Sequence, residues 1–122
     1  MSTPIEIAVR TYAAIFQEPD PSVRATLIET CWAEDGRLVT RSGVIRGRAG
    51  IAAMANAAFA DPRGLTIELA SVIDAKGSTF RFRARTTCRD GSSVPEVFDA
   101  GMIGADGRIT LILTFAGPLA DA

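Results

Sequence analysis

The sequence contains no histidine, and this absence narrows the chemistry that the protein can perform. Histidine is the commonest general base near neutral pH and the commonest metal ligand in proteins. The remaining candidates for proton transfer are carboxyl, phenol and thiol groups. We therefore expect neither a metal ion nor a cofactor, and any acid-base chemistry must rest on these groups.

Cysteine is also scarce, with only Cys31 and Cys88 in the chain. Two thiols are too few for a disulfide framework or a thiolate zinc site, so we expect buried thiols in a reducing compartment. The start, "MSTPIEIAVR", has an early acid and no apolar run of the kind found in signal peptides. No window approaches 18 apolar residues. The sequence predicts a cytoplasmic protein without a membrane partner.

Excess charge of one sign is missing as well. Thirteen Lys and Arg residues nearly balance fourteen Asp and Glu residues, leaving a net charge of -1. Nucleic acid is therefore not an expected partner, because the chain lacks the positive field that phosphate binding needs. With 122 residues, of which 48% are hydrophobic and 22% charged, the chain is expected to form one folded domain over residues 1–122.

Helical periodicity appears in three segments. Residues 3–17, "TPIEIAVRTYAAIFQ", begin with a Thr-Pro pair suited to a cap and a first helical position, and Tyr12 lies on their apolar stripe. The prolines of "EPDP" end this pattern, which resumes over residues 21–32. A third helix is predicted in "GRAGIAAMANAAFADPRG", with Asp61-Pro62 as its end.

Strand patterns dominate the rest of the chain. Residues 37–40 and 43–46 read as two short strands around a turn, and residues 65–75, 78–89, 93–104 and 108–117 read as four longer strands. "ADG" between the last two is a hairpin signal. Helices followed by a run of antiparallel strands predict an α+β fold in which a curved sheet wraps the helices.

Alternation is clearest in residues 79–89, where one face is expected in the core and the other in solvent or against a partner. The apolar face carries Phe80, Phe82, Ala84, Thr86 and Cys88. The opposite face carries Arg81, Arg83, Arg85, Thr87 and Arg89.

The order of these elements, with "CWAEDGRLV", "GVIRGRAGI" and the closing "FDAGMIGADGRITLILTF", resembles the nuclear transport factor 2-like superfamily, especially its SnoaL-like and ketosteroid isomerase-like members. The resemblance runs from about Ile5 to Phe115. It implies a cone-shaped, curved antiparallel or mixed sheet around three N-terminal helices, an α+β roll shared with cystatin-like folds. It also implies a mostly apolar pocket and a homodimer formed through the outer sheet face.

Asp99 is the first candidate for catalysis. It shares strand parity with Val97, Gly101 and Ile103, an otherwise uncharged face, so burial should raise the pKa of its carboxyl. The resemblance places it where isomerase-like and SnoaL-like enzymes carry an acid. Protonated, it would donate to an enolate oxygen, and ionised, it would take a carbon-bound proton. The alternative is a structural Asp bonded to a nearby hydroxyl or to a dimer partner.

Tyr12 is the second candidate, because it matches the isomerase's oxyanion tyrosine. Its hydroxyl needs a partner if buried, and Asp99 would serve; the alternative is an ordinary core tyrosine. Where the isomerase carries its general base, this chain has Thr40, whose hydroxyl is too weakly basic for that role. The remaining residues expected to contact a ligand are Trp32, Phe82, Val97 and Phe115.

Other acids are expected to serve structure. The corner Trp32-Ala33-Glu34-Asp35 is predicted to end the second helix, and the residues Glu34, Asp35, Asp61, Asp90 and Asp106 lie in turn contexts. Glu68 and Glu96 are expected on outer faces. The Arg-x-Asp triad of resembling epoxide hydrolases and the His-Asp pair of dehydratases are both absent.

Two functions therefore stay open. The first is a cyclase-type or isomerase-type enzyme that acts without a cofactor on an apolar carbonyl compound through Asp99 and Tyr12. The second is a ligand-binding or dimerisation module of the same fold without chemistry. The missing base and the missing histidine favour the second slightly.

Overall fold

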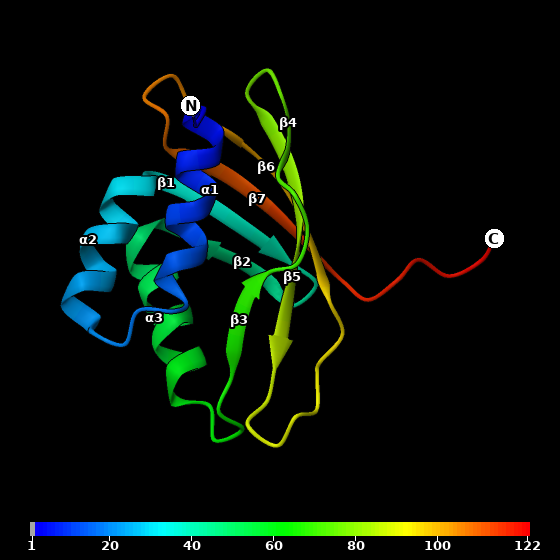
Figure 1. Cartoon of the computed structure of the whole chain (residues 1–122). Coiled ribbons are helices and arrows are strands. Elements are labelled where there is room, and N and C mark those ends of the chain that lie inside the picture. The colour runs from blue at the N-terminus through cyan, green and yellow to red at the C-terminus, as the bar shows by residue number, and fades with distance from the viewer. Residues whose placement is uncertain (1) are drawn as a thin grey trace.

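A computed structural model describes residues 2–122 of the chain. Three helices lie on one side of a curved sheet of seven strands (Figure 1). In chain order, the elements are α1 (Pro4–Ile15), α2 (Pro21–Cys31), β1 (Trp32–Thr40), β2 (Gly43–Arg46), α3 (Gly47–Ala60), β3 (Thr66–Leu69), β4 (Asp74–Lys76), β5 (Thr79–Thr87), β6 (Val97–Ile103) and β7 (Ile109–Ala116).

The helix ends follow local signals in the sequence. Thr3 caps α1, where its Oγ1 accepts a hydrogen bond from the Glu6 amide at 3.2 Å. Asp20 caps α2 in the same way, with Oδ1 accepting from the Ser22 amide at 2.9 Å. Both helices begin at a proline, which is tolerated there because the first helical amides have no intrahelical acceptor. The helix starts expected from the sequence are confirmed.

The sheet has the order β2-β1-β7-β6-β5-β3, and β4 pairs with β5 beside β3. Its β1–β7 pair is parallel and its other pairs are antiparallel, so the sheet is mixed. The strand β2 forms one edge, β3 and β4 form the other, and the sheet stays open between them. The predicted α+β fold with a curved sheet around the helices is confirmed.

The corner at Trp32 differs from the prediction. Helix α2 ends at Cys31, and Trp32 already belongs to β1, so "AEDG" lies inside a strand rather than in a turn. The pairing of β1 with β7 shifts register between Trp32 and Arg37, which marks a bulge at this stretch. Glu34 and Asp35 are exposed there.

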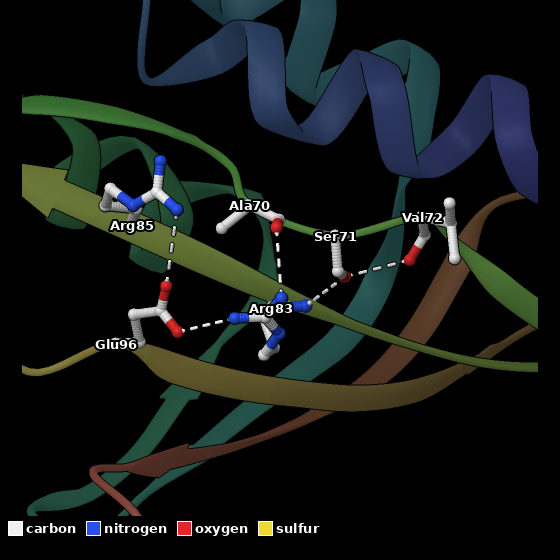
Figure 2. Close-up of polar contacts among 6 residues, drawn as sticks. All are labelled: Ala70, Ser71, Val72, Arg83, Arg85 and Glu96. Atoms are coloured by element: carbon white, nitrogen blue, oxygen red, sulfur yellow. Dashed lines mark hydrogen bonds and ion pairs between the residues drawn. The ribbon is translucent and has the colours of Figure 1, made fainter.

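The segment 65–75 also differs, because it forms two short strands instead of one. Between β3 and β4 the chain leaves regular pairing at residues 70–73, although the Ala70 amide still donates to the carbonyl of Arg83 at 2.9 Å. Ser71 Oγ accepts from the Arg83 amide at 2.8 Å and donates to the Val72 carbonyl (Figure 2). At this break, the Ser71 hydroxyl thus takes the place of the backbone carbonyl that would accept from the Arg83 amide in a regular strand pair.

The core lies between the inner sheet face and the helices. The β5 alternation is confirmed, with Phe80 and Phe82 each 4% exposed and Arg81 exposed on the other face. Trp32 is fully buried and stacks on Tyr12, with ring centroids 5.8 Å apart. Both cysteines are free and buried.

None of the helices within residues 2–122 has the length and apolar character needed to cross a lipid bilayer.

Candidate functional site

A cavity of about 220 Å³ opens between the inner sheet face and the helices α1 and α3. Its wall is mostly apolar, with a small number of polar groups, which is the usual composition of a small-molecule site. The lining residues are Tyr12, Ala13, Phe16, Leu38, Thr40, Met54, Ala58, Ile67, Glu68, Leu69, Phe82, Ala84, Thr86, Val97, Asp99 and Thr114.

Strand register brings three of these residues together. Asp99 of β6 lies opposite Phe82 of β5 on one side and opposite Thr114 of β7 on the other. Residues that face each other across a strand pair point to the same side of the sheet. All three therefore point to the inner face, and Asp99 is only 5% exposed.

The Asp99 carboxyl is a buried acid without a cation. Burial raises its pKa to about 6, and the hydrogen bond that Thr114 Oγ1 donates to Asp99 Oδ1 at 2.6 Å lowers it in part. Among the ion pairs formed within residues 2–122, none involves Asp99. Such a group changes charge near neutral pH, which suits proton transfer.

Tyr12 is a neutral phenol at the same cavity. It is 6% exposed, and burial raises its pKa well above the ordinary value, with the charges of Asp99 and Cys31 raising it further. No hydrogen bond joins its hydroxyl to another residue of the range 2–122. The expected bond to Asp99 is not formed, and the hydrogen-bond partner of Asp99 is Thr114.

The Tyr12 hydroxyl is open to the cavity. Within the described part of the chain, the fully buried side-chain polar atom that lacks a partner is Trp32 Nε1. The Tyr12 hydroxyl also lacks a partner there but is not sealed in, and Tyr12 lines the cavity. It is a donor available to a bound molecule.

Thr40 lines the cavity as expected, but its hydroxyl is engaged elsewhere. Oγ1 donates to the Gly43 carbonyl at 3.3 Å and accepts from the Ser42 amide at 3.1 Å. Both contacts hold the turn between β1 and β2. Thr40 therefore brings no free base to the position where the resembling isomerases carry one.

Of the other residues expected to contact a ligand, Phe82 and Val97 line the cavity, whereas Trp32 and Phe115 do not. Trp32 is fully buried and packs against the ring of Tyr12. Phe115 lies on the outer face and is 60% exposed, because its neighbour Thr114 takes the inward position on β7. The placement of Trp32 and Phe115 in the pocket was wrong.

Sequence reasoning missed Thr114, the residue bonded to Asp99. The "ADG" hairpin signal, together with strand alternation, comes close to finding it, since residues at equal distance from a hairpin turn face each other. A register shift between Met102 and Ile103 breaks that simple count by one residue. The bulge is not visible in the sequence pattern.

The acids expected to serve turns do so at three positions. Asp61, Asp90 and Asp106 each accept a hydrogen bond from the backbone amide two residues ahead, and these contacts help to lower the pKa of each carboxyl. Glu68 is exposed and lies opposite Arg85 in the β3–β5 register. Residues 2–122 hold no group of three or more His, Cys, Asp or Glu side chains placed to bind a metal ion.

Comparison with known proteins identifies the family through structure. The chain matches a solved structure from Agrobacterium tumefaciens strain C58, a candidate isomerase of the SnoaL-like family, with 32% sequence identity and a TM-score of 0.84. That match covers 96% of this chain and 100% of the other. No protein-family model and no curated protein sequence matches the chain.

More distant structures share the fold. A candidate polyketide cyclase from Sinorhizobium meliloti is 17% identical, with 88% of this chain and 93% of that chain covered and a TM-score of 0.66. SalBIII, an epoxide hydrolase/cyclase-like enzyme of pyran ring formation in the polyether salinomycin, is 16% identical, with 93% and 90% covered and a TM-score of 0.69. Together with the full-length match at 32% identity, the architecture shows that this chain belongs to the SnoaL-like family of the nuclear transport factor 2-like superfamily.

Proposed function

We propose that the protein is a cyclase-type or isomerase-type enzyme that binds a small, mostly apolar carbonyl compound and uses Asp99 and Tyr12 for proton transfer. One observation carries this proposal. A desolvated carboxyl and an unpartnered phenol open to the same mostly apolar cavity.

The two groups suit complementary steps. With a pKa of about 6, Asp99 is mostly ionised at pH 7 and takes a proton from the carbon next to the substrate carbonyl. Tyr12 keeps its proton and donates a hydrogen bond to the oxygen that becomes an enolate. The enolate then regains the proton at another carbon in an isomerase, or attacks a second carbonyl of the same molecule in a cyclase.

Asp99 is assigned the role of the base because the other candidate groups at the cavity are less suited to it. The hydroxyl of Thr40 is committed to its turn, and Glu68 lies opposite the outer-face residue Arg85. Glu68 also lines the cavity but is exposed, so Asp99 is the buried acid at the cavity among residues 2–122. The cavity volume of about 220 Å³ falls below the roughly 300–1,000 Å³ of drug-sized sites, which favours a small substrate.

The alternative is a binding module without chemistry. One observation favours it: the bond from Thr114 already satisfies one oxygen of Asp99, as expected for a structural aspartate. In that case the affinity for apolar ligands comes from the cavity wall alone and does not depend on the two polar groups.

Binding of 2-naphthol separates the two functions. This phenol is neutral at pH 7, so it donates to ionised Asp99 and accepts from Tyr12, whereas naphthalene has the same shape without the hydroxyl. Because a hydrogen bond to a charged group contributes about 1.5–3 kcal/mol, Asp99→Asn should weaken 2-naphthol binding by about tenfold or more. Tyr12→Phe should weaken it by a similar factor, and naphthalene binding should be unchanged in both.

The control is Asp74→Asn, which makes the same chemical change at an exposed residue of β4. It should bind 2-naphthol like the wild type. Equal 2-naphthol binding in wild type, Asp99→Asn and Tyr12→Phe would support the binding module and exclude the enzymatic proposal. Absence of any binding by either compound would exclude both functions for this cavity.

We also propose that a second copy of the chain covers the outer sheet face. Phe98, Met102 and Phe115 are exposed on this face at 47%, 38% and 60%, and Phe98 lies opposite Phe115 across the β6–β7 pair. An uncovered apolar surface of this kind is typical of an interface between subunits.

The cytoplasmic location of the protein also stays a prediction.

The arginine side chains of β5 flank this apolar surface and form ion pairs within the chain. They are Arg81, Arg83 and Arg85. Arg83 Nη1 contacts Glu96 Oε2 at 2.7 Å, and Arg85 Nη2 lies 3.6 Å from Glu96 Oε1 (Figure 2). Arg81 pairs with Asp74 at 2.7 Å. Because these arginines already pair with acids of the same chain, they are weaker evidence for a dimer interface on this face than the exposed phenylalanines are.

A further inference from the structure

Thr114 and Asp99 form a fixed pair at the floor of the cavity. They lie directly opposite each other on the inner face of the β6–β7 pair, and Thr114 Oγ1 donates to Asp99 Oδ1 at 2.6 Å. Threonine is β-branched and has few side-chain rotamers in a strand, so its hydroxyl is held in place. The bond therefore holds one of the two carboxyl oxygens in place.

The second carboxyl oxygen is left free. Within residues 2–122, no hydrogen bond reaches Asp99 Oδ2, yet this atom is not among the fully buried polar atoms that lack a partner. Asp99 lines the cavity, so Oδ2 is the oxygen that a bound molecule can meet. The carboxyl is thus asymmetric, with one oxygen facing the protein and the other facing the cavity.

We propose that Thr114 is a positioning residue of the site, which holds Oδ1 of Asp99 so that Oδ2 receives and returns the proton during the reaction. This inference rests on the proposed function. A hydroxyl has a single proton, and Thr114 gives it to Oδ1, so the proton taken from a substrate can settle only on Oδ2. The proton balance is closed, because Oδ2 gains the proton from carbon in one step and in the next gives it to another carbon in an isomerase, or to the newly formed alkoxide oxygen in a cyclase.

The same bond also favours the ionised form of Asp99. A hydrogen bond donated to a carboxylate stabilises the charge, and here it offsets part of the penalty from burial. Without Thr114 the carboxyl would hold its proton more tightly and would be a poorer proton acceptor at neutral pH. Position and protonation state thus depend on one hydroxyl.

The test begins on the ligand-free protein, by following the Asp99 carboxyl carbon with ¹³C NMR through a pH titration. Thr114→Val removes the hydroxyl and keeps the branched shape, and it should raise the titration midpoint by about one pH unit. Thr114→Ser keeps the hydroxyl and should restore it. The control is Thr86→Val, which removes a hydroxyl from the same cavity wall and should leave the midpoint unchanged.

The second measurement is the pH profile of 2-naphthol binding. Thr114→Val should shift the pH at which binding appears upward together with the Asp99 midpoint. With the midpoint moved from about 6 to about 7, the ionised fraction of Asp99, and with it the affinity for 2-naphthol, should fall about twofold at pH 7 and about tenfold at pH 5. Thr114→Ser should behave like the wild type. A merely structural role would weaken binding equally at every pH. If Thr114→Val does not fold, Thr114→Ala provides the same deletion of the hydroxyl.

The inference is overturned if the Asp99 midpoint does not move in the variants that lack the hydroxyl, or if Thr114→Ser fails to restore it. Both results come from the ligand-free titration. They therefore remain readable when 2-naphthol does not bind, which would count against the proposed function alone.

Discussion

At the scale of single residues, the burial of Asp99 is unfavourable for the ionised form of its carboxyl group. Transfer of a charged carboxyl into an apolar surrounding is unfavourable unless a cation or several hydrogen bonds compensate it, and Asp99 has one hydrogen bond. The difference between its pKa of about 6 and the ordinary value of 3.8 corresponds to about 3 kcal/mol. Residues that lower stability in this way are characteristic of functional sites.

This penalty predicts that Asp99→Asn is more stable than the wild type above pH 6. The folded-state pKa of Asp99 is raised, so the unfolded chain ionises first and the penalty grows as pH rises from about 4 to about 6. At pH 8 the variant should gain up to about 3 kcal/mol in the free energy of unfolding, and the gain should shrink toward zero near pH 4. Urea unfolding followed by the fluorescence of Trp32, the single tryptophan, measures it.

Asp74→Asn serves as the control for this experiment, because Asp74 is exposed. Its stability should follow that of the wild type within about 0.5 kcal/mol at both pH values. A loss of stability in Asp99→Asn at pH 8 would mean that the carboxylate is stabilised in the fold and that burial does not dominate its pKa.

At the scale of elements, the strands around β6 pack closely at Gly101, two residues from Asp99. An added Cβ at Gly101 would lie 2.7 Å from Phe80 Cζ and 3.2 Å from Ile112 Cγ1, and it would also meet the Leu111 carbonyl oxygen of β7. Phe80 is itself buried at 4% exposure, and the Leu111 oxygen belongs to the backbone of a paired strand. A glycine is therefore required two residues from Asp99.

We expect Gly101→Ala to lower the free energy of unfolding by about 2 kcal/mol or more, since overpacking a core forces side chains and backbone to shift. Gly104→Ala is the matched control, because the nearest atom to its added Cβ is Thr110 Cγ2 at 3.2 Å and the second is Asp106 Oδ1 at 3.5 Å. Thermal or urea unfolding compares the two. Equal stability of Gly101→Ala and the wild type would contradict the packing described for β6.

The break between β3 and β4 is another feature decided at the element scale. Residues 65–75 have strand character throughout, yet regular pairing with β5 stops at Ala70 and resumes at Asp74. Ser71 replaces the missing backbone partner by accepting from the Arg83 amide. The sequence pattern contains no proline or glycine at this point, so only the neighbouring strand reveals the break.

At the scale of the whole molecule, the helices cover one face of the sheet and leave the other open (Figure 1). The open face carries Phe98 and Phe115 near one end of the β6–β7 pair, where a second copy would bury them. We expect the protein to sediment as a dimer at micromolar concentration. Phe115→Glu should shift it to monomer, because a charge buried in an apolar interface loses its water without gaining a partner.

Ile7→Glu is the control, since Ile7 is an exposed apolar residue of α1, at 54%, on the helical side of the molecule. It should leave the dimer intact. A wild-type protein that sediments as a monomer at micromolar concentration would exclude the proposed interface. The same outcome would leave the cavity and its polar groups available to the ligand experiments.

The sequence alone predicted the features that depend on neighbouring residues. Thr3 and the prolines at helix starts are local signals, and the alternation of β5 put Phe82 inside and Arg83 outside without any knowledge of the neighbouring strands. The uncharged parity of Val97 and Gly101 gave the inward direction of Asp99 and the raised pKa of its carboxyl in the same way.

Which distant residues meet depends on the pairing of the strands in the folded protein. The strand β7 is apolar on both faces, so its pattern does not distinguish Thr114, which points inward, from Phe115, which points outward. The hydroxyl of Thr40 is committed by a turn, and the bond of Asp99 to Thr114 depends on a bulge that shifts the β6–β7 register. The alternation of side chains is a property of one strand and can be recognised in its sequence. Register is a property of two paired strands, and the contact between Asp99 and Thr114 depends on it.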